Sequence, residues 1–100
     1  MKNEEHIHTL HPQGKNGVNI LKRRYNIISD YIRKTLEHEG EISYQDLSGK
    51  AVRDLSDSFD GKVMWYVVTV KLDLEARKII ERVPNTSPHR IRLVAKRENK

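Results

Sequence analysis

Three histidines near the N-terminus have the residue type and spacing of metal ligands. His6, His8 and His11 form the pattern H-x-H-x-x-H, in which imidazoles can share a zinc or nickel ion. A stable metal site also needs rigid hydrogen-bonded groups that hold its ligands in place. The segment 1–18 contains a proline, two glycines and few apolar residues, so we expect an arm without periodic structure and no metal site.

Other patterns that could support catalysis are weaker. The segment 14–17, Gly-Lys-Asn-Gly, lacks the spacing of a phosphate-binding loop and the strand that precedes one. The serines between residues 43 and 58 have no neighbouring base, and Asp54 and Asp57 lie on a face expected to be solvated. There is no cysteine. The sequence therefore predicts that the protein is not an enzyme, and it predicts no cofactor, metal or small-molecule ligand.

Composition limits the size and the class of the protein. A chain of 100 residues builds one domain, and 36% hydrophobic residues suffice for a core. No apolar run is long enough to span a membrane, and the first residues do not resemble a signal peptide, so we expect a cytoplasmic location without membrane binding. The net charge is +5. Positive charge is concentrated in residues 79–100, which is compatible with a nucleic-acid contact or with an ordinary solvated surface.

Apolar periodicity predicts three helices followed by a hairpin. A helix over about 20–39 is indicated by apolar residues spaced four, three, four and four apart, and Gly40 is suited to a left-handed residue at its end. A second helix is expected over 44–58, with Ser43 as its N-cap, and a third over 62–77. Extended runs at 79–83 and 91–94 flank a turn at 84–88 and predict a β-hairpin. The residues expected to form the core are Tyr25, Ile28, Ile32, Leu47, Leu55, Val67, Val70 and Leu74.

The order helix, short strand, helix, helix, hairpin resembles a winged helix, a helix-turn-helix variant. Residues 74–82 are similar to the helix-to-wing junction of many bacterial winged-helix proteins, which usually have glycine where this chain has Lys78. Segments 11–20 and 65–77 resemble a family of small uncharacterised bacterial winged-helix proteins. The resemblance implies an α+β winged helix with three helices, a C-terminal β-hairpin wing and a flexible or packed N-terminal arm. The expected divisions are an arm over 1–18, the winged-helix domain over 19–95 and a basic tail over 96–100.

In a DNA-binding winged helix the third helix lies in the major groove and the wing touches the backbone or minor groove. The net charge and the arginines near the expected wing favour this function. Our first expectation is therefore a small DNA-binding domain similar to bacterial transcriptional regulators. The basic and hydrogen-bonding side chains at the expected DNA surface are Lys22, Arg23, Arg24, Lys62, Thr69, Arg82, Asn85, His89, Arg90 and Arg92.

The outward face of the third helix favours a different function. Trp65, Val68 and Leu72 are apolar where a base-reading helix is normally polar, and Asp73 would repel phosphates. Either the assignment of the face is shifted, or the arm or a second copy of the chain covers it. The first helix has a second apolar strip, which either packs under the wing or lies in an interface. The alternative expectation is a protein-interaction module, homodimeric or heteromeric, that does not bind DNA, with interface residues Ile20, Ile27, Tyr31, Trp65, Val68 and Leu72.

Overall fold

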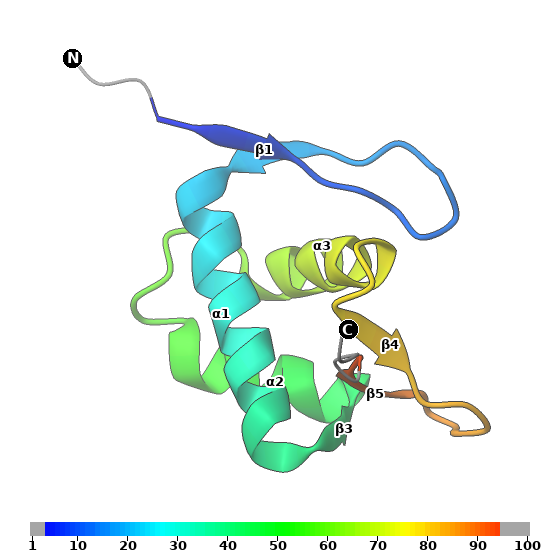
Figure 1. Cartoon of the computed structure of the whole chain (residues 1–100). Coiled ribbons are helices and arrows are strands. Elements are labelled where there is room, and N and C mark those ends of the chain that lie inside the picture. The colour runs from blue at the N-terminus through cyan, green and yellow to red at the C-terminus, as the bar shows by residue number, and fades with distance from the viewer. Residues whose placement is uncertain (1–3, 95–100) are drawn as a thin grey trace, which may run out of the picture.

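Three helices enclose the hydrophobic core. The computed structural model describes residues 4–94 and contains α1 (Lys22–Glu39), α2 (Tyr44–Leu55) and α3 (Val63–Ala76). Helix α3 packs against both α1 and α2, as Figure 1 shows. Seven of the eight predicted core residues are buried, while Leu55 is half-buried against the others. The apolar period of the sequence thus identified the inward face of each helix.

Two small antiparallel sheets complete an α+β domain. The first pairs β1 (His6–His8) with β2 (Asn19–Leu21). The second contains β3 (Glu41–Ser43), β4 (Ile80–Arg82) and β5 (Arg90–Leu93), with β5 between the other two. Ile91 of the central strand lies opposite Ile42 of β3 and is fully buried. The predicted C-terminal hairpin is therefore present, and β3 joins it as a third strand.

The ends of the helices follow from local chemistry. Gly40 ends α1 with φ of 84°, and its N–H donates to the carbonyl of Leu36 at 2.8 Å. The Ser43 hydroxyl caps α2 by accepting from the N–H of Asp46 at 3.0 Å. The predicted extension of α2 to residue 58 was wrong, because the chain turns after Leu55.

The prediction that residues 1–18 lack regular structure was also wrong. Strand β1 pairs with β2 in a register that places Ile7 opposite Ile20. Residues 19–21 are therefore a strand, and α1 begins at Lys22 instead of about residue 20. Ile20 is buried in the core, so its predicted role in an interface was wrong too. Strands of three residues are too short to show an alternating pattern in the sequence.

The segment between β1 and β2 lies along α3, as Figure 1 shows. Thr9 connects the two sides of this segment through two hydrogen bonds to Val18. The N–H of Thr9 donates to the carbonyl of Val18 at 2.8 Å, and the hydroxyl of Thr9 accepts from the N–H of Val18 at 2.9 Å. Gly17 packs so closely that an added Cβ would come within 1.8 Å of the Thr9 carbonyl oxygen. We call residues 4–18 the arm. The predicted basic tail, 96–100, lies outside the described residues, among which no helix is long and apolar enough to cross a membrane.

Candidate functional site

A buried carboxylate connects the arm to two helices. Asp73 of α3 is 0% exposed. It accepts hydrogen bonds from the backbone N–H of Leu10 at 2.8 Å, from Arg77 Nε at 2.8 Å and from the hydroxyl of Tyr25. Burial and the bond to Asp73 raise the pKa of Tyr25 to about 12. The expectation that Asp73 faces outward was wrong, because the arm covers its side of α3.

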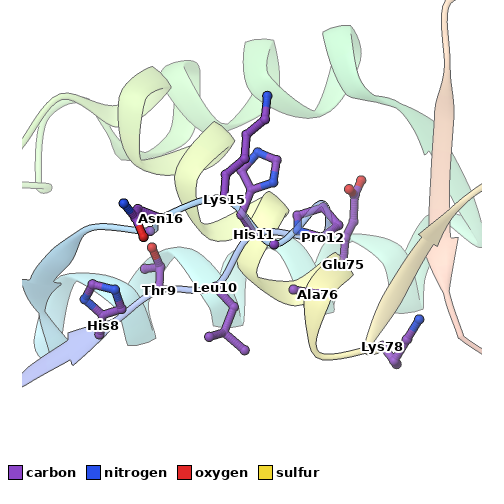
Figure 2. Close-up of a pocket in the computed structure, with 12 residues that line it drawn as sticks. His8, Thr9, Leu10, His11, Pro12, Lys15, Asn16, Glu75, Ala76 and Lys78 are labelled. Atoms are coloured by element: carbon purple, nitrogen blue, oxygen red, sulfur yellow. The ribbon is translucent and has the colours of Figure 1, made fainter.

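The arm and the end of α3 enclose a hollow of about 350 Å³. Figure 2 shows the arm segment from His8 to Asn16 beside the last turn of α3, where Glu75 and Ala76 lie. The next turn places Lys78 at the edge of this hollow, with a left-handed φ of 66°. Lys78 adopts this conformation although glycine is the residue that adopts it most readily.

A second hollow, of about 490 Å³, opens on the outward side of the same contact. It is lined by His11, Pro12, Gln13, Lys15, Leu72, Glu75 and Arg82. The Glu75 carboxylate lies 2.9 Å from Lys71 Nζ and 3.7 Å from Arg82 Nε, and its side chain is only 9% exposed. Lys15 and Arg82 are exposed. Within the described part of the chain, Glu75 is the one carboxylate that lines this hollow, and it is paired and nearly buried. The exposed rim of the hollow, formed by Lys15 and Arg82, is therefore positively charged.

The outward face of α3 carries an apolar row that leads toward this hollow. We call Met64, Trp65, Val68 and Leu72 the α3 stripe. Met64 is 55% exposed and Trp65 is 44% exposed, while Val68 and Leu72 are half-buried. The Trp65 ring packs edge-on against Tyr66, with centroids 4.9 Å apart. The arm therefore covers the Asp73 side of α3 and leaves Trp65 in solvent.

The polar candidates on α3 are few. Lys62 is exposed immediately before α3, and Thr69 is half-buried. The only lysine within α3, Lys71, is 2% exposed, is paired with Glu75 and lies over the ring of Tyr44. The exposed surface of α3 thus offers few donors for base edges.

The basic residues at the start of α1 are paired within the chain. Arg23 and Arg24 both contact the carboxylate of Asp60, each at 3.1 Å, and Arg23 also contacts Glu4 at 3.3 Å. Arg24 donates further to the hydroxyl of Tyr66 at 2.9 Å. Hydrogen bonds from Arg24 and then Arg23 hold the pKa of Asp60 below its usual value. The neighbouring Lys22 lies 3.7 Å from Glu5.

The arginines of the C-terminal hairpin are paired in the same way. Arg90 lies 2.9 Å from Glu41, and Arg92 lies 2.7 Å from Glu81. The turn residue Asn85 is exposed with φ of 64°. Most of the positive charge predicted to contact phosphate is therefore balanced locally by carboxylates.

His89 follows the hairpin turn and packs inward. Its ring stacks on Tyr44, with centroids 5.7 Å apart, and its Nε2 atom is buried without a hydrogen-bond partner among the described residues. Burial lowers the pKa of His89, and the nearby charges of Lys71 and Arg82 lower it further. His89 is held in the packing beneath the hairpin, away from where a phosphate contact would form.

The second apolar strip of α1 is smaller than predicted. Tyr31 is half-buried and donates its hydroxyl to Asp54 of α2 at 2.7 Å, while Ile27 stays exposed. Within residues 4–94, no three side chains of the metal-binding types gather as a candidate metal site, and His6 and His8 are exposed on β1.

Sequence reasoning found Trp65, Val68 and Leu72 but missed Met64 and the contribution of the arm. Met64 lies four residues before Val68 and therefore on the same side of the helical wheel, which was an available signal. Lys15 and Leu10 gave no such signal, because their positions depend on how the arm docks.

Comparison with known proteins relates the chain to a family. A sequence model of the DUF6958 family matches residues 6–91. The chain belongs to DUF6958, a family of unknown function. The match covers β1, the rest of the arm from His6 onward and all three helices. No curated protein and no solved structure matches the chain.

Proposed function

We propose that the chain is a winged-helix domain that binds a partner protein through the α3 stripe. Two features support the winged-helix assignment. The three-stranded sheet has the order β3-β5-β4, with its last two strands following α3 as a wing would. The chain also adopts a left-handed conformation at Lys78, at the junction where related wings favour glycine.

The observation that carries the proposed function is the apolar α3 stripe. An exposed methionine and an exposed tryptophan stand side by side and continue into two half-buried aliphatic residues. Methionine and aromatic residues are enriched in protein interfaces, and contiguous exposed apolar surface marks them. A groove-entering helix instead needs donors and acceptors for base edges.

The state of the basic residues supports the same proposal. Arg23 and Arg24 share the carboxylate of Asp60, and Arg23 is also paired with Glu4, while Arg90 and Arg92 are each paired with a carboxylate of their own. Phosphate binding would have to break these ion pairs or compete with them. The pairs are exposed and individually weak, so they reduce DNA affinity without abolishing it.

Duplex DNA binding through the wing is the second candidate. It is favoured by the net charge of +5 and by the exposed Lys62 and Asn85 at the surface where a winged helix meets DNA. A bacterial regulator-like role would follow from this candidate.

Photo-crosslinking in cells tests the proposed function. A photoreactive amino acid at position 68, in the centre of the stripe, is expected to form discrete protein adducts. The same residue at position 30, an exposed site on α1, is the matched control and should form none of these adducts. Nucleic-acid adducts from position 68 would refute the proposal.

A gel-retardation assay with duplex DNA at two salt concentrations separates the two candidates. We expect at most weak retardation at low salt that Trp65→Ala does not change, because non-specific contacts come from lysine and arginine. Strong retardation that Trp65→Ala or Lys62→Ala removes would place DNA on α3 and support the second candidate.

A further inference from the structure

We infer that the partner segment of the α3 stripe is an amphipathic helix that carries carboxylates at one end. This inference rests on the proposed function and adds the chemistry and direction of the partner. Its apolar side would cover the stripe, and its acidic end would lie beside Lys15 of the arm and Arg82 of β4.

The apolar part of the inference follows from spacing. Val68 lies four residues after Met64, and Leu72 lies four after Val68, so these three residues form a row along α3, with Trp65 beside it three residues before Val68. A partner helix with apolar residues at positions i, i+3 or i+4 and i+7 forms a matching row. The row is short, so we expect a modest, reversible interaction.

The acidic end of the partner helix follows from the second hollow, which lies at the Leu72 end of the α3 stripe. Leu72 lines this hollow together with Lys15 and Arg82. The carboxylate of Glu75 is directed toward Lys71 at 2.9 Å, whereas its distance to Arg82 is 3.7 Å. Arg82 is 58% exposed, and its guanidinium retains donors that a closer carboxylate could occupy. An incoming acidic side chain would thus meet two cations beside an apolar floor.

The same charges argue against a second copy of the chain as the occupant. Two stripes packed in parallel would bring Lys15 and Arg82 against their own copies. Packed antiparallel, the cationic end would meet Lys62 and Asp60, and Asp60 is already held by Arg23 and Arg24. Neither arrangement supplies the carboxylate that the rim attracts.

The arm makes this site composite. Lys15 belongs to the arm, and the arm is joined to α3 through the bond from the Leu10 N–H to Asp73. Asp73 is therefore a positioning residue, because it holds the arm, and with it Lys15, beside Arg82. Loosening the arm should weaken partner binding without altering the stripe.

Trp65, the only tryptophan, reports directly on the stripe. The full chain is titrated with a synthetic amphipathic helix that has leucine on one side and glutamates at one end, and separately with a counterpart that carries lysines in place of the glutamates. We expect the acidic peptide to shift Trp65 emission to shorter wavelength, to reduce acrylamide quenching and to bind less tightly at higher salt. The basic peptide should produce neither change.

Charge-reversal variants test the direction. Lys15→Glu and Arg82→Glu should each weaken binding of the acidic peptide by about tenfold, or about 1.4 kcal/mol. Lys34→Glu makes the same change of charge on exposed α1 surface and should leave the affinity unchanged. Equal weakening by all three variants would show that only net charge matters and would overturn the inference.

Other outcomes of the titration identify a different occupant. A shift on concentrating the protein alone would indicate a second copy, and a shift with oligo(dT) would indicate nucleic acid; either overturns the inference. If the acidic peptide fails to bind while position 68 still crosslinks to protein, the acidic helix is wrong and the proposed function stands. If those crosslinks reach nucleic acid, both are wrong.

Discussion

Replacing Asp73 by alanine should destabilise the protein by about 3–5 kcal/mol. The substitution leaves the buried Tyr25 hydroxyl and the part-buried Leu10 N–H without their acceptor. Each buried donor left unpaired costs about 1–3 kcal/mol. The third donor, Arg77, is 36% exposed and can turn to water, so it adds little.

Asp54 provides a matched control. Like Asp73, Asp54 accepts hydrogen bonds from a tyrosine hydroxyl, that of Tyr31, and from an arginine Nε, that of Arg53. Unlike Asp73, Asp54 is exposed. Asp54→Ala should therefore cost much less stability than Asp73→Ala. The comparison isolates burial, because the two carboxylates have the same types of side-chain partner.

Chemical unfolding followed by circular dichroism measures both variants. Hydrogen exchange then locates the effect: amides of the arm, including Val18, should lose protection in Asp73→Ala, while the core of α1 should stay protected under native conditions. A loss of stability below about 1 kcal/mol in Asp73→Ala, or an arm that remains protected, would refute the role given to Asp73.

Three further predictions each rest on a single residue and its surroundings. Gly17→Ala should loosen the arm, because its Cβ would meet the Thr9 carbonyl oxygen, whereas Gly49→Ala, in open space on α2, should stabilise by about 0.5–1 kcal/mol; equal unfolding midpoints would contradict this. Lys78→Gly should stabilise by about 0.5–1 kcal/mol, because glycine adopts the left-handed φ of 66° without strain, and a loss in thermal unfolding would count against it. Stability should fall as pH drops below about 6.5, since the lowered pKa of His89 favours its neutral form in the folded state. That acid-side loss should be smaller in His89→Gln, and an unchanged pH profile would remove His89 as its cause.

The helices were predictable because each buries one face. The period of four and three from Tyr25 to Leu36 identifies the inward side of α1. Gly40 marks the end of α1 by its left-handed backbone, and Ser43 marks the start of α2 by its capping hydroxyl. The hairpin at the C-terminus was predictable for a related reason, because its turn is rich in proline and polar residues.

The arm and the burial of Asp73 were not predictable in this way. A helical wheel gives the direction of Asp73 relative to the core but says nothing about a distant segment that covers it. Leu10 and Asp73 are 63 positions apart, and their contact leaves no local periodic signal. The α3 stripe was identified from residue type, but its charged end depends on Lys15, which only the docked arm places there.

The same separation has a consequence for the order of folding. We expect the arm to dock after α1 and α3 have packed, because Asp73, which holds the arm through Leu10, is itself held by Tyr25 of α1. Docking of the arm therefore belongs to the late side of the folding barrier, where native contacts affect unfolding more than folding. Weakening the arm should accelerate unfolding and leave the folding rate almost unchanged. The domain would then lose its arm first as it opens, passing through a state with an intact helical core and a bare third helix.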